Sequence, residues 1–345
     1  MSSVLQELLR TRNWVLADGA TGTRLFEMGL PHGEAPEVWN LEHPERIREH
    51  YRAFLDAGAD LVLTNSFGGT ANRLKLHGLA SAVHDVNARA AHLLREMVDR
   101  HGRPVVCAGS IGPTGELFEP LGPLTRETAR AAFREQVEGL KDGGIDVVWI
   151  ETMSSLDEVE AAIAAAGEAG VPACCTMSFD TNGRTMMGVE PGVFAAWLEG
   201  QVPRPVAYGG NCGTGAADLL ASLVCLRERM HAGDVLIAKA NCGIPQYVDG
   251  AIRYSGTPEL MAGFAVLARD LGVRIIGGCC GTAPEHLSAM RRALEQSPPG
   301  PVPCLETIIA RVGPLTTAFG GGPPQARKGR RRRAERTGPA GERRS

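Results

Sequence analysis

The feature that most constrains the fold is an alternation of short apolar runs with helix-like stretches, repeated eight times along the chain. The runs are rich in apolar and β-branched residues, which is typical of buried strands. Repeated strand–helix alternation predicts parallel strands joined by crossover helices. The predicted strands are Trp14–Ala17, Leu61–Leu63, Pro104–Ala108, Val147–Ile150, Pro172–Met177, Pro205–Tyr208, Val235–Ala238 and Val273–Ile276.

Helix signals lie between these runs. In His43–Ala57 apolar residues recur at helical spacing, and Gly58 provides a C-terminal stop. Ser155–Glu168 opens with Ser-Leu-Asp-Glu, the pattern of a capping box. Pro258 and Pro284 stand near helix starts, where proline is favoured. The predicted helices are His43–Ala57, Leu124–Lys141, Ser155–Glu168, Ala216–Met230, Pro258–Leu271 and Pro284–Glu295.

Eight strand–helix repeats favour an α/β fold of the (β/α)8 TIM barrel type, in which roughly 250 residues form one domain. An open doubly wound sheet is the competing fold, but Gly19-Ala20-Thr21-Gly22 does not match the G-x-G-x-x-G expected after its first strand. We predict a barrel over residues 1–298, a C-terminal extension over 299–325 and a disordered Arg-rich tail over 326–345. The extension carries one apolar patch and is expected either to pack on the barrel or to form a homo-oligomer contact. That patch consists of Leu305, Ile308, Ile309 and Val312.

Charge is distributed unevenly along the chain. Residues 326–345 hold nine Arg and Lys against two Glu, so they carry +7 and the other 325 residues carry −10 of the total −3. The acidic body argues against nucleic-acid binding. The tail is expected to be a solvated extension, although a basic run also suits RNA, a membrane surface or a partner. The sequence has no apolar run of the ~18 residues that a membrane helix needs, and its first residues lack the apolar core of a secretory signal. We therefore expect a cytoplasmic protein whose nine cysteines stay reduced.

Polar and thiol side chains follow nearly every predicted strand. Residues directly after the strands of a barrel line one mouth, and active sites lie there. The side chains in question are Asp18, Thr64, Asn65, Ser110, Glu151, Cys212, Cys242, Cys279 and Cys280.

The most specific segment is Gly277-Gly278-Cys279-Cys280-Gly281-Thr282. Neighbouring cysteines rarely form a disulfide with each other because its geometry is strained, and the flanking glycines let both sulfurs turn toward one point. Cys212 could add a third thiolate, and three sulfurs with an open fourth position suit a catalytic zinc site. On spacing alone Cys242 rivals Cys212, and the alternative for the adjacent pair is simple core packing. The remaining cysteines, predicted to be structural, are Cys107, Cys174, Cys175, Cys225 and Cys304.

Six motifs together resemble the homocysteine S-methyltransferase family, in order, over residues about 10 to 297. That family includes betaine–homocysteine methyltransferases, S-methylmethionine-dependent enzymes and the homocysteine module of cobalamin-dependent methionine synthase. The whole-chain pattern is most similar to bacterial proteins labelled betaine–homocysteine methyltransferase. The motifs are Asp18-Gly19-Ala20-Thr21-Gly22-Thr23, Thr64-Asn65-Ser66-Phe67, Gly109-Ser110-Ile111-Gly112-Pro113, Glu151-Thr152, Gly210-Asn211-Cys212 and Gly277-Gly278-Cys279-Cys280-Gly281.

The resemblance implies a Zn²⁺-bearing barrel whose ligands are Cys212, Cys279 and Cys280. The family's seventh strand usually ends in Asn-Ala-Gly, so Cys242 replaces an alanine and is not an expected ligand. It remains a candidate for a nearby thiol that influences metal loss or oxidation. The metal would deprotonate homocysteine's thiol, which otherwise stays protonated at neutral pH. The thiolate would then attack a methyl group on a cationic donor and leave as methionine.

Four further residues are candidates for binding the amino-acid part of homocysteine. Asp18 and Glu151 are expected to hold its ammonium group, as the resemblance also implies, although an Asp before a glycine is equally typical of a turn cap. Thr64 and Ser110, with backbone N–H groups of the nearby turns, are candidates for its carboxylate.

The identity of the methyl donor is the part of the function that the sequence determines least. Glycine betaine, which would yield dimethylglycine, ranks first by overall similarity. A quaternary ammonium favours an aromatic cage, yet Gly68 and Thr152 stand where the animal betaine enzymes have tyrosines. The rings that could serve instead are Trp39, Phe67, Tyr208 and Tyr247. The alternative donors are S-methylmethionine, methylfolate and a methyl-corrinoid partner protein. A related thiol could replace homocysteine as the acceptor. From another class of function, the alternative is a non-catalytic thiol-rich zinc-binding barrel.

Overall fold

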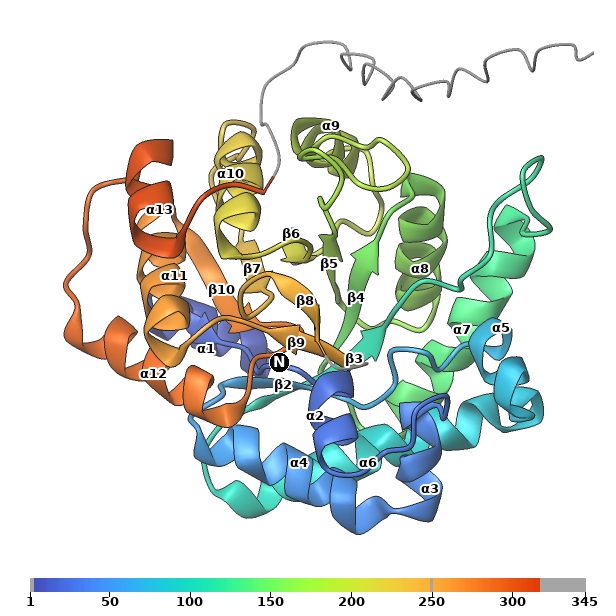
Figure 1. Ribbon diagram of the computed structural model, residues 1–345. Helices are drawn as coiled ribbons and strands as arrows, with labels where there is room; N and C mark the ends of the chain where they lie inside the picture. The colour runs from blue at the N-terminus through green and yellow to red at the C-terminus, as the bar shows by residue number, and fades with distance from the viewer. Residues whose placement is uncertain (1–2, 249–250, 317–345) are drawn as a thin grey trace, which may run out of the picture.

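The computed structural model describes residues 3–248 and 251–316, and its centre is one sheet of eight parallel strands. Around the sheet the strand order is β1-β10-β7-β6-β5-β4-β3-β2. A parallel bridge between Ala17 and Leu61 joins the two end strands, where the Asp18 N–H donates to the Leu61 carbonyl at 2.9 Å. The sheet therefore closes on itself, and the predicted (β/α)8 barrel is confirmed (Figure 1). The strands are β1 Val15–Leu16, β2 Leu61–Leu63, β3 Val106–Ile111, β4 Val147–Met153, β5 Ala173–Met177, β6 Ala207–Cys212, β7 Leu236–Ala240 and β10 Val273–Gly278.

Helices surround the barrel, and the six predicted ones are found with ends shifted by at most three residues. The longest helix of the described residues, α6, is not among the predicted ones, although Val83, Val86 and Ala90 recur on its buried face. A hairpin of β8 (Pro245–Val248) and β9 (Ala251–Tyr254) after β7 was equally absent from the prediction. The helices are α1 Val4–Thr11, α2 Gly22–Glu27, α3 Trp39–Glu42, α4 Pro44–Asp56, α5 Ala71–Leu74, α6 Val83–His101, α7 Arg126–Asp142, α8 Leu156–Glu168, α9 Pro191–Leu198, α10 Ala216–Arg227, α11 Pro258–Asp270, α12 Pro284–Gln296 and α13 Leu305–Val312, with 3-10 turns η1 Pro36–Val38, η2 Lys75–His77 and η3 Ala80–Ala82.

The core has two layers, because successive strand residues face opposite sides of the sheet. Side chains such as Val15, Trp149 and Ile237 fill the inside of the barrel. Two leucines of α1 belong to the same inner cluster. Residues between them in sequence, such as Leu16 and Ile150, pack outward against the helices. This alternation decides which strand-end side chains reach the barrel's interior.

The predicted capping box at Ser155 does not form. Ser155 is the N-cap of α8, but its side chain makes no capping hydrogen bond. The carboxylate of Glu158, which should reach back to Ser155, instead accepts hydrogen bonds from both the N–H and the hydroxyl of Thr114, each at 2.7 Å. A tertiary contact to the loop after β3 has therefore displaced the local one.

The described part of the predicted extension, residues 299–316, lies against the barrel's own helices. Ile308 and Val312 are buried there, and the Thr316 hydroxyl donates to Asp218 of α10 at 2.8 Å. The Arg-rich segment 326–345, predicted to be disordered, lies outside the described residues. None of the helices within residues 3–248 and 251–316 has the length and apolar character that would let it cross a membrane.

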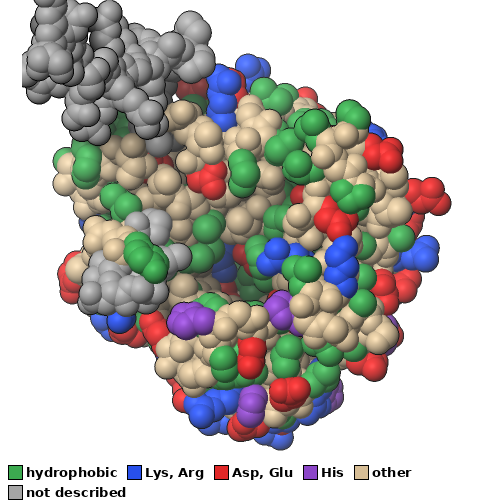
Figure 2. Space-filling view, turned by 45° about the vertical axis from the view of Figure 1, so that its right-hand side comes forward, with side chains coloured by type: hydrophobic (Ala, Val, Ile, Leu, Met, Phe, Trp, Pro, Cys, Tyr) green, Lys and Arg blue, Asp and Glu red, His purple; other side chains and the backbone are tan. Residues whose placement is uncertain are grey.

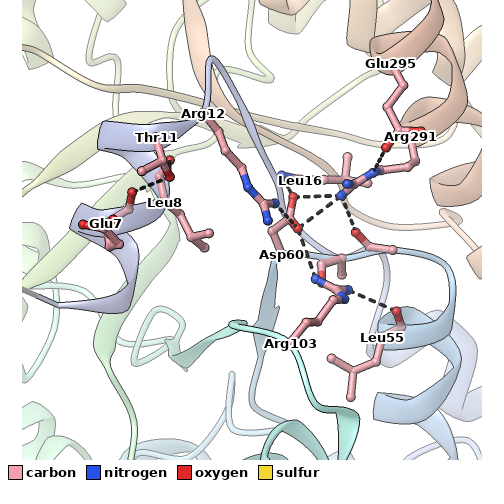
Figure 3. A network of polar contacts seen from close by, with 12 residues as sticks. Glu7, Leu8, Thr11, Arg12, Leu16, Leu55, Asp60, Arg103, Arg291 and Glu295 are labelled. Atoms are coloured by element: carbon pink, nitrogen blue, oxygen red, sulfur yellow. Dashed lines mark hydrogen bonds and ion pairs between the residues drawn. The ribbon is translucent and has the colours of Figure 1, made fainter.

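A charged cluster joins four segments that lie far apart in the sequence (Figure 3). Asp60, which is fully buried, lies just before β2 and accepts the Leu16 N–H of β1 at 3.1 Å. Three arginines from separate segments bind its carboxylate: Arg12 at 2.7 Å, Arg103 at 3.1 Å and Arg291 at 3.1 Å. We call this group the Asp60 cluster, and it lies at the end of the strands opposite to the polar side chains described next.

Candidate active site

A cavity of about 360 Å³ opens at the carboxyl ends of the strands. Seven strand ends contribute to its wall, as expected for a barrel active site. Figure 2 shows this face hollowed near its centre, with Lys or Arg and His side chains at the edge of the hollow. We call its inner half the buried and half-buried lining residues Thr64, Ser110, Glu151, Thr152, Cys212, Lys239, Cys279 and Cys280.

Three cysteines meet in this inner half. The sulfurs of Cys212, Cys279 and Cys280 lie within 4.8 Å of one another. Three thiolates around one tetrahedral zinc, with Zn–S bonds of about 2.3 Å, would lie roughly 3.8 Å apart. The donor set and spacing therefore fit a zinc ion with one open position. Cys242 is not part of this group: it is buried, and its N–H donates to the Cys280 carbonyl at 2.9 Å.

The backbone around these cysteines is unusual and firmly held. Cys212 has φ +61°, in the left-handed region that a side chain rarely adopts. After β10, a Cβ on Gly278 would lie 2.2 Å from Thr282, and one on Gly281 would lie 2.4 Å from Tyr254. Only glycine fits at these two positions, so the Gly-Cys-Cys-Gly pattern follows from close packing around the sulfurs.

Two asparagines tie the cysteine-bearing loops together. Asn211 accepts the Thr152 N–H at 2.8 Å and its amide approaches the Cys279 sulfur at 3.8 Å. The Asn241 side-chain oxygen accepts the Cys280 N–H at 3.1 Å. Both asparagines belong to the predicted strand-end segments, but their role as supports could not be inferred without the pairing of β6 with β7 and of β7 with β10.

The thiols strongly influence one another's ionisation. The pKa of Cys279 lies well above the usual thiol range, first because its sulfur hydrogen-bonds with Cys212 and then because it is partly removed from solvent. Three half-buried thiols this close together cannot all ionise without a cation, since like charges repel. A divalent cation would remove that obstacle, because coordinated thiols are deprotonated outright.

Glu151 lies beside this cluster, and it lines the same cavity. It is 7% exposed, and its Oε1 accepts the hydroxyl hydrogen of Ser110 at 2.6 Å. Burial raises the pKa of Glu151, while the charge of Lys239 and the Ser110 hydrogen bond lower it. Its position two residues after the inward-facing Trp149 places it inside the barrel, as the period of a strand requires.

Asp18, the other predicted ammonium ligand, has its carboxylate engaged within the protein. One oxygen forms an ion pair with Lys239, and the other accepts the Leu63 N–H at 2.8 Å. Asp18 is completely buried and does not line the cavity. The structure thus brings Asp18 next to the site without presenting it to a ligand.

The predicted carboxylate ligands also make internal contacts. The Thr64 hydroxyl hydrogen-bonds with Ser66 at 2.5 Å and accepts the Ser110 N–H at 3.0 Å. The Ser110 hydroxyl is the donor to Glu151 already described. Both residues line the cavity, and in this geometry they orient Glu151 and the loop after β2.

Lys239 lines the site but was not among the predicted site residues. It is 1% exposed, lies in β7 and lines the cavity. Its ammonium group lies 5.8 Å from the centre of the Trp149 ring. The negative charges of Asp18 and Glu151 stabilise its protonated form. The signal was available: Lys239 follows the inward-facing Ile237 by two residues. A charged residue inside an apolar strand is rarely buried without a partner.

Of the four rings considered for an aromatic cage, only Phe67 lines the cavity. Trp39 is buried against His43, and the Tyr208 hydroxyl donates to Asp234 at 2.9 Å. Tyr247 is 79% exposed on the hairpin after β7. Cys107, Cys174 and Cys175 are buried as predicted, whereas Cys225 and Cys304 are exposed and do not pack in the core.

Comparison with known proteins gives a family match over most of the chain. The model of the homocysteine S-methyltransferase family matches residues 15–294. The methionine synthase of Mycobacterium leprae is 31% identical over 327 residues, which cover 88% of this chain and 26% of that protein. The methionine synthase of Mycobacterium tuberculosis is 29% identical, covering 81% of this chain and 24% of that protein. The chain thus spans about a quarter of the length of these relatives.

A solved structure is also similar over nearly its whole length. The homocysteine methyltransferase MmuM from Escherichia coli, in a metallated form, superimposes with a TM-score of 0.70 at 25% identity. The match covers 84% of this chain and 99% of MmuM. Its oxidised form is similar to the same degree, with a TM-score of 0.69.

Proposed function

Since this chain belongs to the homocysteine S-methyltransferase family, we propose that it transfers a methyl group from a small cationic donor to the thiol of homocysteine, giving methionine, at a Zn²⁺ ion held by Cys212, Cys279 and Cys280. The observation that carries the proposal is the meeting of three sulfurs at the inner end of a cavity that also contains a buried carboxylate. A structural zinc site would need neither the cavity nor the carboxylate. These features favour catalysis over the alternative of a non-catalytic zinc-binding barrel.

The proposed roles of the chain's own residues follow from their charges. The metal, when bound, supplies a positive centre that holds the substrate sulfur as a thiolate. Glu151 receives the ammonium group of homocysteine, and the Ser110 hydroxyl keeps the Glu151 carboxylate in place. Lys239 neutralises Asp18, so one negative charge of this group, that of Glu151, is left for one substrate ammonium.

The reaction is a displacement at the methyl carbon. The sulfur of homocysteine forms the new S–CH3 bond with its own electron pair. The bond between the methyl group and the donor's nitrogen breaks, and its electrons stay on the nitrogen. A cationic nitrogen favours this step, because the donor then leaves as a neutral amine. From a sulfonium donor the C–S bond breaks instead, its electrons stay on sulfur, and a neutral thioether leaves. From glycine betaine the leaving product is dimethylglycine.

Glycine betaine is the donor we propose first. A single aromatic ring, Phe67, lines the described cavity, so an aromatic cage does not support this choice and charged groups would have to hold the donor. S-Methylmethionine has the same cationic character and is the next candidate. Methylfolate, which the sequence leaves open, remains an alternative donor.

A methyl-corrinoid protein is a second candidate donor, and one observation favours it. Large apolar side chains are exposed on loops around the mouth of the barrel, where a partner protein would have to approach. Among them are Leu121 and Met186, both 74% exposed, after β3 and β5. The relatives called methionine synthase are about four times as long as the region they share with this chain, which leaves room in them for further modules.

The deciding experiment is a donor panel. Reduced, zinc-loaded protein is given homocysteine with betaine, dimethylsulfonioacetate, S-methylmethionine, methyltetrahydrofolate or a methyl-corrinoid protein, and methionine is counted. We expect methionine and dimethylglycine in equal amounts with betaine. Methionine from another donor alone would keep the zinc-thiolate chemistry and reject betaine. No methionine from any donor would reject the proposed function.

A cysteine variant tests the metal assignment. Cys279→Ser is expected to lose both bound zinc and methyl transfer, because a hydroxyl is a far poorer zinc ligand than a thiolate. The matched control is Cys304→Ser, since Cys304 is exposed and outside the cluster. Zinc content by elemental analysis and methionine formation are measured on both variants. A zinc-loaded, active Cys279→Ser protein would contradict the assignment.

A further inference from the structure

The outer half of the cavity carries charges that homocysteine does not use. Glu34 and Glu37 lie on the segment that leads into η1 and within it, and Arg73 and His77 lie on α5 and η2. All four line the cavity, and because Glu34, Arg73 and His77 are exposed, we call this its outer half, in contrast to the half-buried cysteine cluster and the buried Glu151. Both signs of charge are therefore present at the end of the cavity from which a methyl donor would face the bound sulfur.

Glu37 is a buried carboxylate that faces no resident cation at bonding distance. It is 4% exposed, and its Oε1 accepts the Gly68 N–H at 2.6 Å. No ion pair joins it to a Lys, Arg or His among the described residues. Burial raises the pKa of Glu37, and this is offset only in part by hydrogen bonds from the backbone N–H groups of Glu37 and Gly68 and by the more distant charges of Arg73 and His77. A buried carboxylate of this kind is stabilised by a cation that enters the cavity.

Arg73 offers the complementary charge. Its guanidinium lies at the cavity wall beside Gly115, where an added Cβ would lie 3.2 Å from Nη1. Within residues 3–248 and 251–316 no hydrogen bond or ion pair engages this side chain. By contrast Lys75, on the same short segment, pairs with Glu116 at 2.5 Å. The Arg73 donors are therefore free for a ligand, and a guanidinium binds a carboxylate through two parallel hydrogen bonds.

We infer that the outer half of the cavity binds the head of a zwitterionic methyl donor, with Arg73 on its carboxylate, His77 nearby, and Glu37 beside its cationic group. This inference rests on the proposed function. It narrows the donor class to small ammonium or sulfonium compounds that carry a carboxylate. Betaine, dimethylsulfonioacetate and S-methylmethionine belong to that class, whereas choline and trimethylsulfonium do not.

The arrangement also accounts for the near absence of aromatic rings. An aromatic cage recognises the cation of a quaternary ammonium through its methyl groups. Here recognition would come from two charged contacts, Arg73 with the carboxylate of the donor and Glu37 with its cationic group. Anchoring the carboxylate at Arg73 leaves the methyl-bearing centre to point inward, toward the sulfur of homocysteine. Arg73 and Glu37 thus act as specificity-determining residues.

The test uses Arg73→Gln, with Arg73→Lys as the conservative variant and Lys75→Gln as the control. Lys75→Gln removes the same charge from the same segment, but Lys75 does not line the cavity. KM for the donor, KM for homocysteine and kcat are measured on the zinc-loaded full chain, with the donor that the wild type uses. Choline or trimethylsulfonium is tested in parallel as a donor without a carboxylate.

We expect Arg73→Gln to raise the donor KM by about 10- to 100-fold, the range of a charged hydrogen bond, with homocysteine KM unchanged. Arg73→Lys should recover part of this loss, and Lys75→Gln should match the wild type. The preference for carboxylate donors over choline or trimethylsulfonium should disappear in Arg73→Gln. Glu37→Gln, which keeps an oxygen for the Gly68 N–H, should also raise the donor KM.

The outcomes separate this inference from the proposed function. If the wild type forms methionine and Arg73→Gln leaves the donor KM unchanged, the donor site is overturned and the methyltransferase stands. An equal effect of Arg73→Gln on donors with and without a carboxylate would also overturn it. Use of a methyl-corrinoid protein alone would overturn it in the same way. Absence of methionine from every donor in the wild type would reject the proposed function itself.

Discussion

At the scale of single residues, the site is organised around a buried lysine between two carboxylates. Lys239 binds Asp18 and is attracted by Glu151. The two acids, which look alike in the sequence, therefore differ in their surroundings: Asp18 has an internal cation, and Glu151 faces the cavity. Environment, rather than residue type, gives Asp18 an internal partner and leaves Glu151 facing the cavity, and the binding role proposed for Glu151 rests on that difference.

Removing Lys239 should show how much the ion pair with Asp18 contributes to stability. Lys239→Met leaves the Asp18 carboxylate buried without its cation, and we expect a loss of about 3–5 kcal/mol in the free energy of unfolding. The double variant Lys239→Met with Asp18→Asn should recover much of that loss, because position 18 then no longer carries an unpaired buried charge. Urea unfolding of the three proteins measures both values. Equal stability of the single and double variants would show that the ion pair is not the cause.

A second prediction concerns the charge of Glu151. Only the ionised carboxylate attracts an ammonium group, and burial raises the pKa of Glu151 above the usual ~4.3. Binding of methionine should therefore weaken as the pH falls through that raised pKa, at a higher pH than for an exposed glutamate. Calorimetric titration of zinc-loaded protein with methionine measures this, with zinc content checked at each pH. Glu151→Gln should bind more weakly and lose the pH dependence; an identical acid limb in that variant would assign it to another group.

At the scale of elements, tertiary contacts overrule local patterns. The capping pattern of α8 is present in the sequence, yet Thr114 takes the Glu158 carboxylate. In α4, His50 lies on the buried face beside Tyr51 and Phe54. Neither of its ring nitrogens has a hydrogen-bond partner among the described residues. The His50 ring is thus held in place by packing rather than by hydrogen bonds.

This placement makes α4 sensitive to acid. Burial lowers the pKa of His50 from 6.5 to about 3, so the unfolded chain binds a proton that the folded chain does not. Stability is therefore lost as the pH falls below 6.5, by about 2 kcal/mol at pH 5. His50→Leu should remove that part of the pH dependence. The free energy of unfolding between pH 7 and pH 5 is compared in the two proteins, and parallel curves would contradict the assignment.

At the scale of the whole molecule, closure of the barrel depends on contacts between distant segments. The Asp60 cluster joins residues 12, 60, 103 and 291 in one group (Figure 3). Asp60 also holds β1 against β2 through the Leu16 N–H. The cluster lies at the opposite end of the barrel from the cavity, in keeping with the division between stability and activity in this fold.

Asp60→Asn should therefore separate stability from function. We expect the free energy of unfolding to fall by about 3 kcal/mol. This value is at the lower end of the range for a broken buried ion pair, because the three arginines can reach solvent. KM for homocysteine at a temperature where the variant stays folded should equal that of the wild type. Thermal or urea unfolding and steady-state kinetics measure the two effects. A changed KM with unchanged stability would show that the cluster serves the site instead.

The sequence by itself determined the barrel fold and the candidate cysteine cluster. Eight strand–helix repeats indicate the barrel, because the period of apolar residues is a local property. The Gly-Cys-Cys-Gly segment and Cys212 could be singled out because thiols at strand ends have few other uses. Family membership follows from motifs whose order along the chain can be compared directly.

Only the tertiary structure decided what each polar residue contacts. The burial of Asp18 against Lys239, the support of Cys279 and Cys280 by Asn211 and Asn241, and the free guanidinium of Arg73 all join residues far apart in sequence. A side chain's charge state and availability depend on which groups surround it, and closing the barrel brings those groups together. No local pattern contains that information, because the partners come from different strands.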